Sequence, residues 1–261
     1  MTSRSGKSDQ EGLIKEGLIM SEIRTTLITG GNSGIGEALA KKLVARGQRV
    51  VSVGLEQPGW THDLLAAYRA DLTNIEQTRA IAQEICRDHA VDSLVHNAGV
   101  ILPNLLPDAK PEDILMLAQL HLGAPMLLTQ AALEGMRARR FGRIVFVSSR
   151  AAMGAVTRSA YSATKAGVHG MARTWALELA ASGITVNVVA PGPILTDNFW
   201  GIIPNGSEQQ ERMARNVPVG RLGSREDVAH AISFFLDEHS DFVTGQVLYV
   251  CGGTSLVGLG P

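Results

Sequence analysis

The chain has 261 residues, and its 24 lysine and arginine residues nearly balance 25 aspartate and glutamate residues, giving a formal net charge of −1. This length suits one α/β domain with a sizeable core, and the balanced charge argues against a general attraction for nucleic acid or an anionic membrane. Cys86 and Cys251 lack the spacing of a disulfide framework or a zinc site, so we expect a cytoplasmic protein without a bound metal. No apolar run reaches the ~18 residues of a spanning helix, so we expect no membrane partner.

Residues 1–22 form a polar, irregular stretch that contains glycines. We expect a flexible tail here, with an ordered arm at a subunit contact as the less supported alternative. Residues 23–261 are expected to form a single domain, because no linker, internal repeat or low-complexity segment divides them.

Short β-branched runs alternate with longer helical patterns from Thr25 onward. The strand candidates are 25–29, 49–53, 92–96, 143–148, 184–189 and 246–250, with a weaker one near 68–70. The helix candidates are 34–46, 74–88, 111–138, 159–181 and 224–236. This alternation predicts a Rossmann-type doubly wound parallel β-sheet of about seven strands with helices on both faces. An eight-stranded α/β barrel is the competing architecture, but it would usually need another strand and helix.

A glycine-rich loop joins the first predicted strand to the first predicted helix. Residues 29–36 read TGGNSGIG and run directly into the helical pattern. Glycines permit a tight turn and a close approach of the backbone to a ligand, and a helix N-terminus offers free N–H groups to a pyrophosphate. We therefore expect a dinucleotide at this loop. A purely structural turn is the alternative, since a glycine-rich loop alone is a weak signal.

The TGxxxGxG spacing resembles that of the short-chain dehydrogenase/reductase family. Further segments match the family in order from about Thr25 to Ser255, namely Asn97-Ala98-Gly99, the pair Tyr161 and Lys165 in a YxxxK pattern, and the run PGPILT at 191–196. The resemblance implies an NAD(P)-dependent oxidoreductase that interconverts a secondary alcohol and a ketone. Its partner would be a small-molecule alcohol or carbonyl substrate.

Tyr161 and Lys165 are the expected proton-handling pair. Residues four apart share one face of a helix, so both side chains can reach one site. An ammonium group beside the phenol is expected to lower the tyrosine pKa from its usual value of ~10. Alone, the pattern is weak, because tyrosine and lysine commonly lie on solvated helix faces. Its position downstream of the glycine loop favours catalysis.

The resemblance also implies a serine that holds the substrate oxygen. Counting along the strand from Gly142 selects Ser149, whereas counting back from Tyr161 selects Ser148. We expect Ser149, because strand register determines side-chain direction more strictly than loop length does. The hydroxyl of Ser148 would then bond to nearby backbone.

His121 stands where many family members carry an asparagine that holds a water in a proton relay. A histidine can also pass protons, and its usual pKa near ~6.5 would make the relay sensitive to pH. The alternative is a packed histidine with a hydrogen-bonded ring.

The family's cofactor contacts carry over to many positions of this sequence. The resemblance implies that Asp71 and Leu72 contact the adenine, and that Ile194 and Thr196 lie near the nicotinamide. The full set of expected cofactor residues is Gly30, Asn32, Ser33, Gly34, Ile35, Gly36, Glu56, Asp71, Leu72, Asn97, Ala98, Gly99, Tyr161, Lys165, Pro191, Gly192, Ile194 and Thr196.

The adenosine ribose is expected to meet the residues just after the second strand. Glu56 would repel a 2′-phosphate, and Ser33 stands where many NADP-dependent members have a basic residue. We therefore expect NAD rather than NADP. An exposed loop acid is the alternative role for Glu56.

Two departures from the family pattern support a rival function, a cofactor-binding protein with little or no turnover. One is His121, and the other is Cys251, where the family often has an aspartate. An epimerase or dehydratase is a third reading, although such relatives are typically longer.

Substrate contacts are expected mainly from the variable segment 197–216, which carries Phe199 and Trp200. Arg150 could meet a carboxylate, although packing or surface roles are favoured for all of these residues. The resemblance also implies a homotetramer or dimer, with the helices at 111–138 and 159–181 as the interface.

Overall fold

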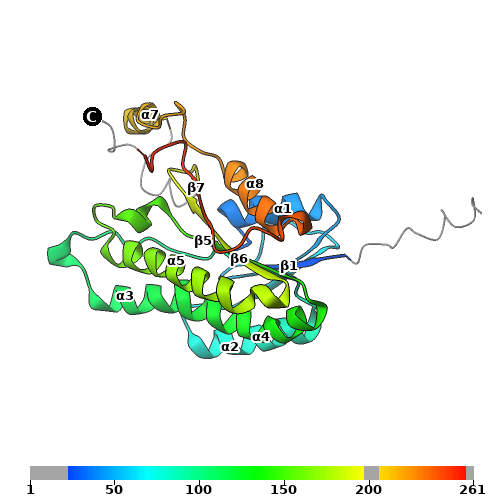
Figure 1. Ribbon diagram of the computed structural model, residues 1–261. Helices are drawn as coiled ribbons and strands as arrows, with labels where there is room; N and C mark the ends of the chain where they lie inside the picture. Colours follow the sequence, from blue (N-terminus) through cyan, green and yellow to red (C-terminus); the bar gives the residue numbers. More distant parts are fainter. Residues whose placement is uncertain (1–22, 197–205, 257–261) are drawn as a thin grey trace, which may run out of the picture.

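The computed structural model describes residues 23–196 and 206–256, and its strands form one parallel sheet (Figure 1). The strand order is β3-β2-β1-β4-β5-β6-β7, so the predicted doubly wound sheet is confirmed. The strands are β1 Thr25–Thr29, β2 Arg49–Gly54, β3 Leu65–Arg69, β4 Ser93–His96, β5 Gly142–Val147, β6 Ile184–Pro191 and β7 Val247–Val250. The third strand begins earlier than the sequence pattern suggested. The predicted tail at 1–22 lies outside the described residues.

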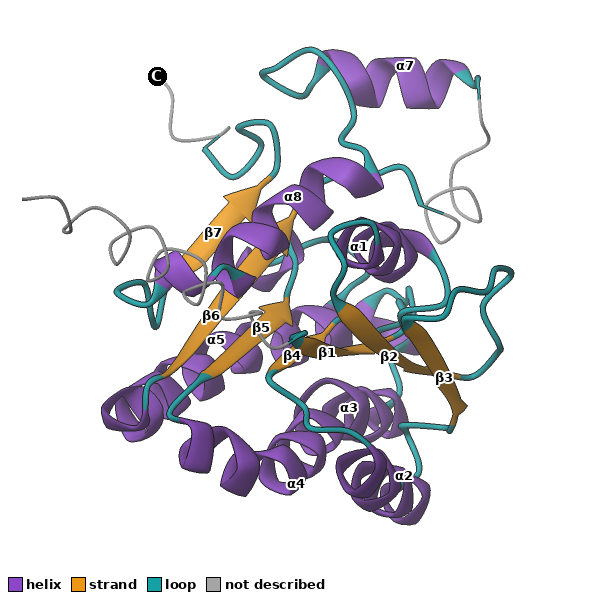
Figure 2. Cartoon of the chain, turned by 90° about the vertical axis from the view of Figure 1, so that its right-hand side faces the viewer, coloured by secondary structure: helices purple, strands orange, loops and turns teal. Residues whose placement is uncertain are grey.

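Helices cover both faces of the sheet (Figure 2). Helices α1 (Gly34–Val44) and α8 (Arg225–Leu236) pack on one face, and α2 (Ile75–Asp88), α4 (Ala124–Arg139) and α5 (Ser159–Leu179) on the other. Central strands are apolar on both sides because each face is covered by helices. In β5, Ile144 and Phe146 contribute to the core beneath α4 and α5, and Val145 to the core beneath α1 and α8.

The stretch predicted as one helix at 111–138 is divided by a π-helical turn. It comprises α3 (Pro111–Ala118), the turn Gln119–Gly123 and α4. Pro125 has no N–H to donate to the carbonyl of His121, and the Ala124 N–H bonds to the carbonyl of Gln119, five residues back. A locally wider helix therefore accommodates Pro125. His121 lies in this wider turn.

The whole span Pro111–Arg139 is long and apolar enough, by length and composition, to cross a membrane. Polar residues such as Gln119 and His121 interrupt this span, so it contains no uninterrupted apolar run of the length expected above for a spanning helix. In the structure α3 packs against α5 and α4 packs against α2. The apolar character therefore serves packing within the helical layer (Figure 1). A further helix, α7 (Glu208–Arg215), was not predicted.

Candidate active site

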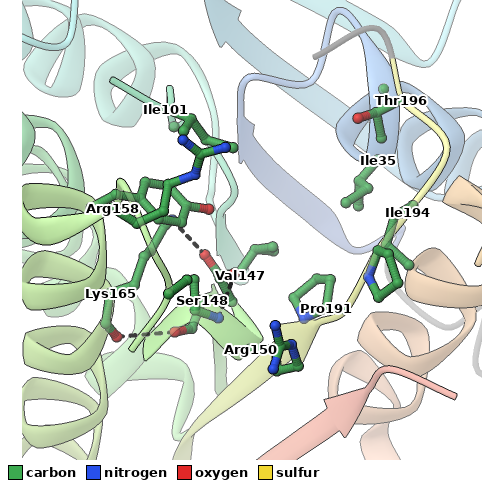
Figure 3. A pocket seen from close by; sticks show the side chains of 18 of the residues that line it. Ile35, Ile101, Val147, Ser148, Arg150, Arg158, Lys165, Pro191, Ile194 and Thr196 are labelled. Carbon is green, nitrogen blue, oxygen red and sulfur yellow. Dashed lines mark hydrogen bonds between the residues drawn. The ribbon is translucent and has the colours of Figure 1, made fainter. Parts of the chain in front are cut away.

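A cavity of about 690 Å³ opens at the carboxyl ends of the central strands, beside the switch point between β1 and β4 (Figure 3). This size suits a small-molecule ligand, and the position is the usual ligand site of an open α/β sheet. Most of the predicted site residues line it, namely Gly30, Ser33, Gly34, Ile35, Asn97, Ala98, Gly99, Ser149, Tyr161, Lys165, Pro191, Gly192, Ile194 and Thr196. The structure therefore brings together residues that are far apart in the sequence.

The glycine loop has the backbone geometry that a phosphate cradle requires. Gly30 has a φ of +63°, and a Cβ on Gly36 would lie 2.1 Å from the carbonyl oxygen of Gly30. Any larger residue at position 36 would therefore clash with backbone. The side chain of Ser33 makes no capping hydrogen bond, so it leaves the first N–H groups of α1 available. These N–H groups at the cavity wall fit the pyrophosphate of a dinucleotide.

Asn97 braces the glycine loop from the end of β4. Its Nδ2 donates hydrogen bonds to the carbonyl oxygens of Thr29 and Gly30 at 3.1 and 3.0 Å. The hydroxyl of Thr29 accepts hydrogen bonds from the backbone N–H groups of Asn97 and Ala98 at 2.9 and 3.0 Å. These four bonds hold the glycine loop and the turn after β4 against each other.

Lys165 is buried at the bottom of the cavity. Its Nζ donates a hydrogen bond of 2.8 Å to the carbonyl oxygen of Val147 and lies 5.7 Å from the centre of the Tyr161 ring. Burial lowers the pKa of Lys165 to about 7. The amine can therefore exchange a proton near neutral pH.

Burial raises the pKa of Tyr161 above its usual value. A hydrogen bond with the Ser149 hydroxyl and the positive charge of Arg158 both lower this pKa and so oppose the effect of burial. The prediction that the Lys165 ammonium lowers the tyrosine pKa was wrong, because desolvation dominates in this structure.

The two candidate serines have different surroundings. The Ser148 hydroxyl is buried beneath α5, where it donates to the carbonyl oxygen of Lys165 at 3.0 Å and contacts His169 Nε2 at 2.8 Å. The Ser149 hydroxyl hydrogen-bonds Tyr161 and accepts a hydrogen bond from the N–H of Ala151 at 3.1 Å. Both serines line the cavity, but Ser149, the one that the strand count selects, is the serine that acts on the pKa of Tyr161.

His121 lies behind the cavity wall, almost fully buried. Its Nδ1 is 2.9 Å from the hydroxyl of Thr164, which also reaches the carbonyl oxygens of Ala160 and Tyr161 at 3.0 and 3.1 Å. The threonine proton can therefore go to a carbonyl, and the imidazole then donates from Nδ1. Within the described part of the chain, His121 Nε2 has no hydrogen-bond partner.

The imidazole of His121 stays neutral in this environment. Burial, together with the charge of Lys165, lowers its pKa to about 2. The expectation that its own titration makes a relay sensitive to pH was therefore wrong. The ring packs edge-on against Tyr161, with the ring centroids 5.7 Å apart. A Cβ on Gly99 would lie 2.9 Å from His121 Nε2 and 3.3 Å from Lys165 Nζ, so a larger residue there would displace both side-chain ends.

The residues predicted for the adenosine end lie outside the cavity wall. The Asn32 side chain is tied to β2, since it accepts from the Ser52 hydroxyl and donates to the carbonyl oxygen of Glu56. It also fills the space beside Gly54, where the family often has an aspartate. The other predicted residues outside the lining are Gly36, Glu56, Asp71, Leu72 and His121. Asp71 caps the turn before α2 by accepting from the N–H and hydroxyl of Thr73.

Sequence reasoning missed several cavity residues. Arg158 directly precedes α5 and lines the cavity close to Tyr161, as do Ile101, Ala155 and residues at the end of α7. Met213 and Asn216 confirm that part of the segment 197–216 reaches the cavity. Phe199 and Trp200 lie outside the described residues. The only signal for Arg158 was its place three residues before Tyr161.

Comparisons with known proteins agree along nearly the whole chain. A family model described as enoyl-(acyl carrier protein) reductase matches residues 30–255. The 3-oxoacyl-[acyl-carrier-protein] reductase FabG of Haemophilus influenzae is 36% identical over 243 residues, which cover 89% of this chain and 98% of that protein. The (2S)-[(R)-hydroxy(phenyl)methyl]succinyl-CoA dehydrogenase subunit BbsD of Thauera aromatica is 39% identical over 244 residues, which cover 89% and 97%.

Solved structures share the fold. An oxidoreductase of the short-chain dehydrogenase/reductase family from Burkholderia thailandensis matches with a TM-score of 0.82 and 31% identity, over 91% of this chain and 94% of that one. A proposed NAD(P)-dependent gluconate 5-dehydrogenase from Beutenbergia cavernae, solved with bound NADP at low occupancy, matches with a TM-score of 0.79 and 30% identity, over 88% and 96%.

These likenesses support a nicotinamide cofactor but not the predicted preference for NAD, because one similar structure is described with NADP. They do not favour the alternative of a cofactor-binding protein without turnover, because the similar proteins are named as reductases and dehydrogenases. The chain belongs to the short-chain dehydrogenase/reductase family of NAD(P)-dependent oxidoreductases.

Proposed function

We propose that this protein interconverts a secondary alcohol and a ketone, with Tyr161 as the general acid and base. The observation that carries the proposal is the meeting of Tyr161, Ser149 and Lys165 in one cavity whose opposite wall is the glycine loop. The names of the similar proteins include a 3-oxoacyl carrier-protein reductase, a substituted succinyl-CoA dehydrogenase and a gluconate dehydrogenase. All of these names fit chemistry at a hydroxyl or carbonyl carbon.

Each of the three side chains has a distinct part in the proposed reaction. During oxidation, the Ser149 hydroxyl donates a hydrogen bond to the substrate oxygen. The Tyr161 phenol first gives up its own proton toward the neutral amine of Lys165, and the resulting phenolate takes the alcohol proton. Bound NAD(P) supplies the chemistry of hydride acceptance, or of hydride donation in the reverse direction. Lys165 holds a proton close to Tyr161 and can exchange it because its pKa is about 7. Reduction reverses the proton movements.

His121 is proposed as a positioning residue for Lys165. A neutral ring that donates from Nδ1 to Thr164 presents the lone pair of Nε2 as an acceptor. This nitrogen is buried without a partner among the described residues, and the charge of Lys165 acts on it. We propose that Nε2 accepts a hydrogen bond from the Lys165 side, directly or through a water, and so orders the amine.

We also propose that the protein prefers NAD to NADP. Glu56 follows β2 and is exposed, and Ser33 supplies no positive charge, which favours NAD. Arg69 is paired with Gly54 at the same sheet edge and is a basic residue available to a 2′-phosphate. Titration with both reduced cofactors, for the unaltered protein and for Arg69→Gln, decides between them. A loss restricted to NADPH affinity would contradict the NAD proposal.

Cytoplasmic location and homo-oligomer formation also stay proposals. Cys86 and Cys251 are free thiols, as expected in a reducing compartment. The proposed interface is formed by α3, α4 and α5, the helices in the predicted stretches 111–138 and 159–181.

The direct test is a screen of alcohols and ketones with both cofactors, following the absorbance of reduced nicotinamide. Tyr161→Phe should lower kcat by about 10²–10⁴-fold, the usual contribution of a general acid or base, while cofactor binding is kept. Activity that survives Tyr161→Phe on every accepted substrate would overturn the proposed mechanism.

A further inference from the structure

The lining of the cavity is positively charged. Its described lining contains three cationic side chains, Arg150, Arg158 and Lys165, and no aspartate or glutamate. Within residues 23–196 and 206–256, neither arginine forms a salt bridge with a carboxylate. A partly buried guanidinium without a counter-ion is costly, because burial removes water that would otherwise solvate the charge. A bound anion would remove that cost.

The backbone before α5 holds Arg158 at the cavity. Arg158 forms a β-bridge with Asn104, and the Asn104 N–H donates to the carbonyl oxygen of Thr157 at 3.0 Å. Thr157 has a φ of 67°, in the left-handed region that a β-branched residue rarely adopts. Such strain persists only where the surrounding contacts impose it, and it often occurs at functional sites.

Most N–H donors of the Arg158 guanidinium have no partner among the described residues. Its only hydrogen bond among the described residues goes from Nη1 to the hydroxyl of Thr157 at 2.9 Å. Arginine has five N–H donors in a planar fork, which matches the two oxygens of a carboxylate.

Arg158 is poorly placed for the cofactor phosphates. Figure 3 shows Arg158 with Ile101 and Lys165 on one side of the cavity, whereas Ile35, in the helix that begins at the phosphate cradle, lies on the opposite side. An anion at Arg158 would therefore belong to the substrate and stand close to the reacting carbon. The neighbouring wall is apolar, with Ile101 and Ala155 among its residues.

We infer that the substrate carries a free carboxylate near its reacting carbon, and that Arg158 binds this carboxylate as a specificity-determining residue. Arg150 adds positive potential on another side of the cavity (Figure 3). This inference rests on the proposed function. A carboxylate in this position favours an oxo or hydroxy acid as the substrate over an acyl thioester attached to a carrier. The phosphate of such a carrier would lie far from the reacting carbon.

The test measures binding without turnover, in the Tyr161→Phe background with reduced cofactor bound. The probes are acetoacetate, methyl acetoacetate and the acetoacetyl thioester of N-acetylcysteamine, each titrated while the fluorescence of the reduced nicotinamide is followed. Acetoacetate should bind at least about tenfold more tightly than the other two, a difference of about 1.4 kcal/mol. Adding Arg158→Gln should remove this preference, and Arg158→Lys should retain part of it because it keeps the charge.

Arg46→Gln, a change in the exposed turn after α1, is the matched control and should leave the preference intact. Cofactor affinity, measured first for each variant, restricts the comparison to folded protein. Equal binding of the three probes, or a preference that survives Arg158→Gln, would overturn the inference. Failure of the proposed function would appear separately, as absence of turnover of every probe and alcohol by the protein with Tyr161 intact.

Discussion

Lys165→Met should stabilise the protein while abolishing its activity. Burial holds the lysine pKa at about 7 instead of 10.5. The native state therefore disfavours the charged amine. At a pH where the lysine is charged in both the native and the unfolded protein, this lowers the free energy of unfolding by up to about 5 kcal/mol, at 1.36 kcal/mol per pKa unit. A methionine of similar shape avoids this cost, and it forfeits about 1 kcal/mol for the lost hydrogen bond to Val147.

The sign of the pH dependence follows from the lowered pKa. Between about pH 7 and 10.5 the unfolded chain binds more protons than the native protein, so the stability of the unaltered protein rises with pH in this window. The advantage of Lys165→Met is therefore greatest below pH 7 and shrinks as the pH rises.

Urea unfolding at pH 6, 7, 8 and 9 measures this advantage as a difference in the free energy of unfolding. Lys110→Met, at an exposed lysine before α3, is the control and should show no such trend. A destabilised Lys165→Met, or an advantage that is the same at every pH, would refute the reasoning.

Further substitutions at three places test the surroundings of Tyr161. Ser149→Ala should lower kcat/KM by about 10²-fold, because the substrate oxygen loses a hydrogen-bond donor. Ser148→Ala should chiefly lower the free energy of unfolding, by about 1–2 kcal/mol as measured in urea. Equal losses of activity in the two variants would contradict this assignment. His121→Leu should lower kcat by about tenfold at every pH from 6 to 9, because the imidazole is neutral throughout this range and acts as an acceptor. His121→Asn should restore kcat. An unchanged kcat in His121→Leu would remove His121 from the mechanism. Gly99→Ala should lower kcat, with an unfolding cost of about 1–2 kcal/mol, because its Cβ meets the movable ends of His121 and Lys165. An unaltered kcat would show that both side chains yield without consequence.

Strand periodicity predicted the sheet, because alternation along a strand is a local feature, whereas most of the cavity wall was predicted from the family resemblance together with the glycine loop. Ser149 could be chosen over Ser148 for the same reason, since alternation along β5 is a local property. The π-helical turn was not foreseen, although Pro125 inside a helical pattern was an available signal. Arg158 was missed because its importance arises from the cavity that it faces, and no sequence pattern describes that cavity.

The pKa of Tyr161 shows most clearly what a local pattern cannot supply. The spacing of Tyr161 and Lys165 correctly placed both side chains in one site, but the direction of the tyrosine pKa depends on burial, which only the assembled fold determines. The same dependence on assembly explains His121, whose usual pKa suggested a titrating relay but whose burial keeps it neutral.

Several departures from ordinary structural preference lie on one side of the cavity. Lys165 and the Nε2 atom of His121 are buried polar groups with few or no partners among the described residues, Thr157 adopts a left-handed backbone, and the turn bearing His121 is π-helical. Each of these features costs stability, whereas the two apolar cores beneath the helical layers obey the usual rules of patterning and burial. A protein can keep such destabilising features where the side chains concerned act on a ligand. The position of these four features around Tyr161 supports locating the chemistry there on energetic grounds, in addition to the motif that first suggested the site.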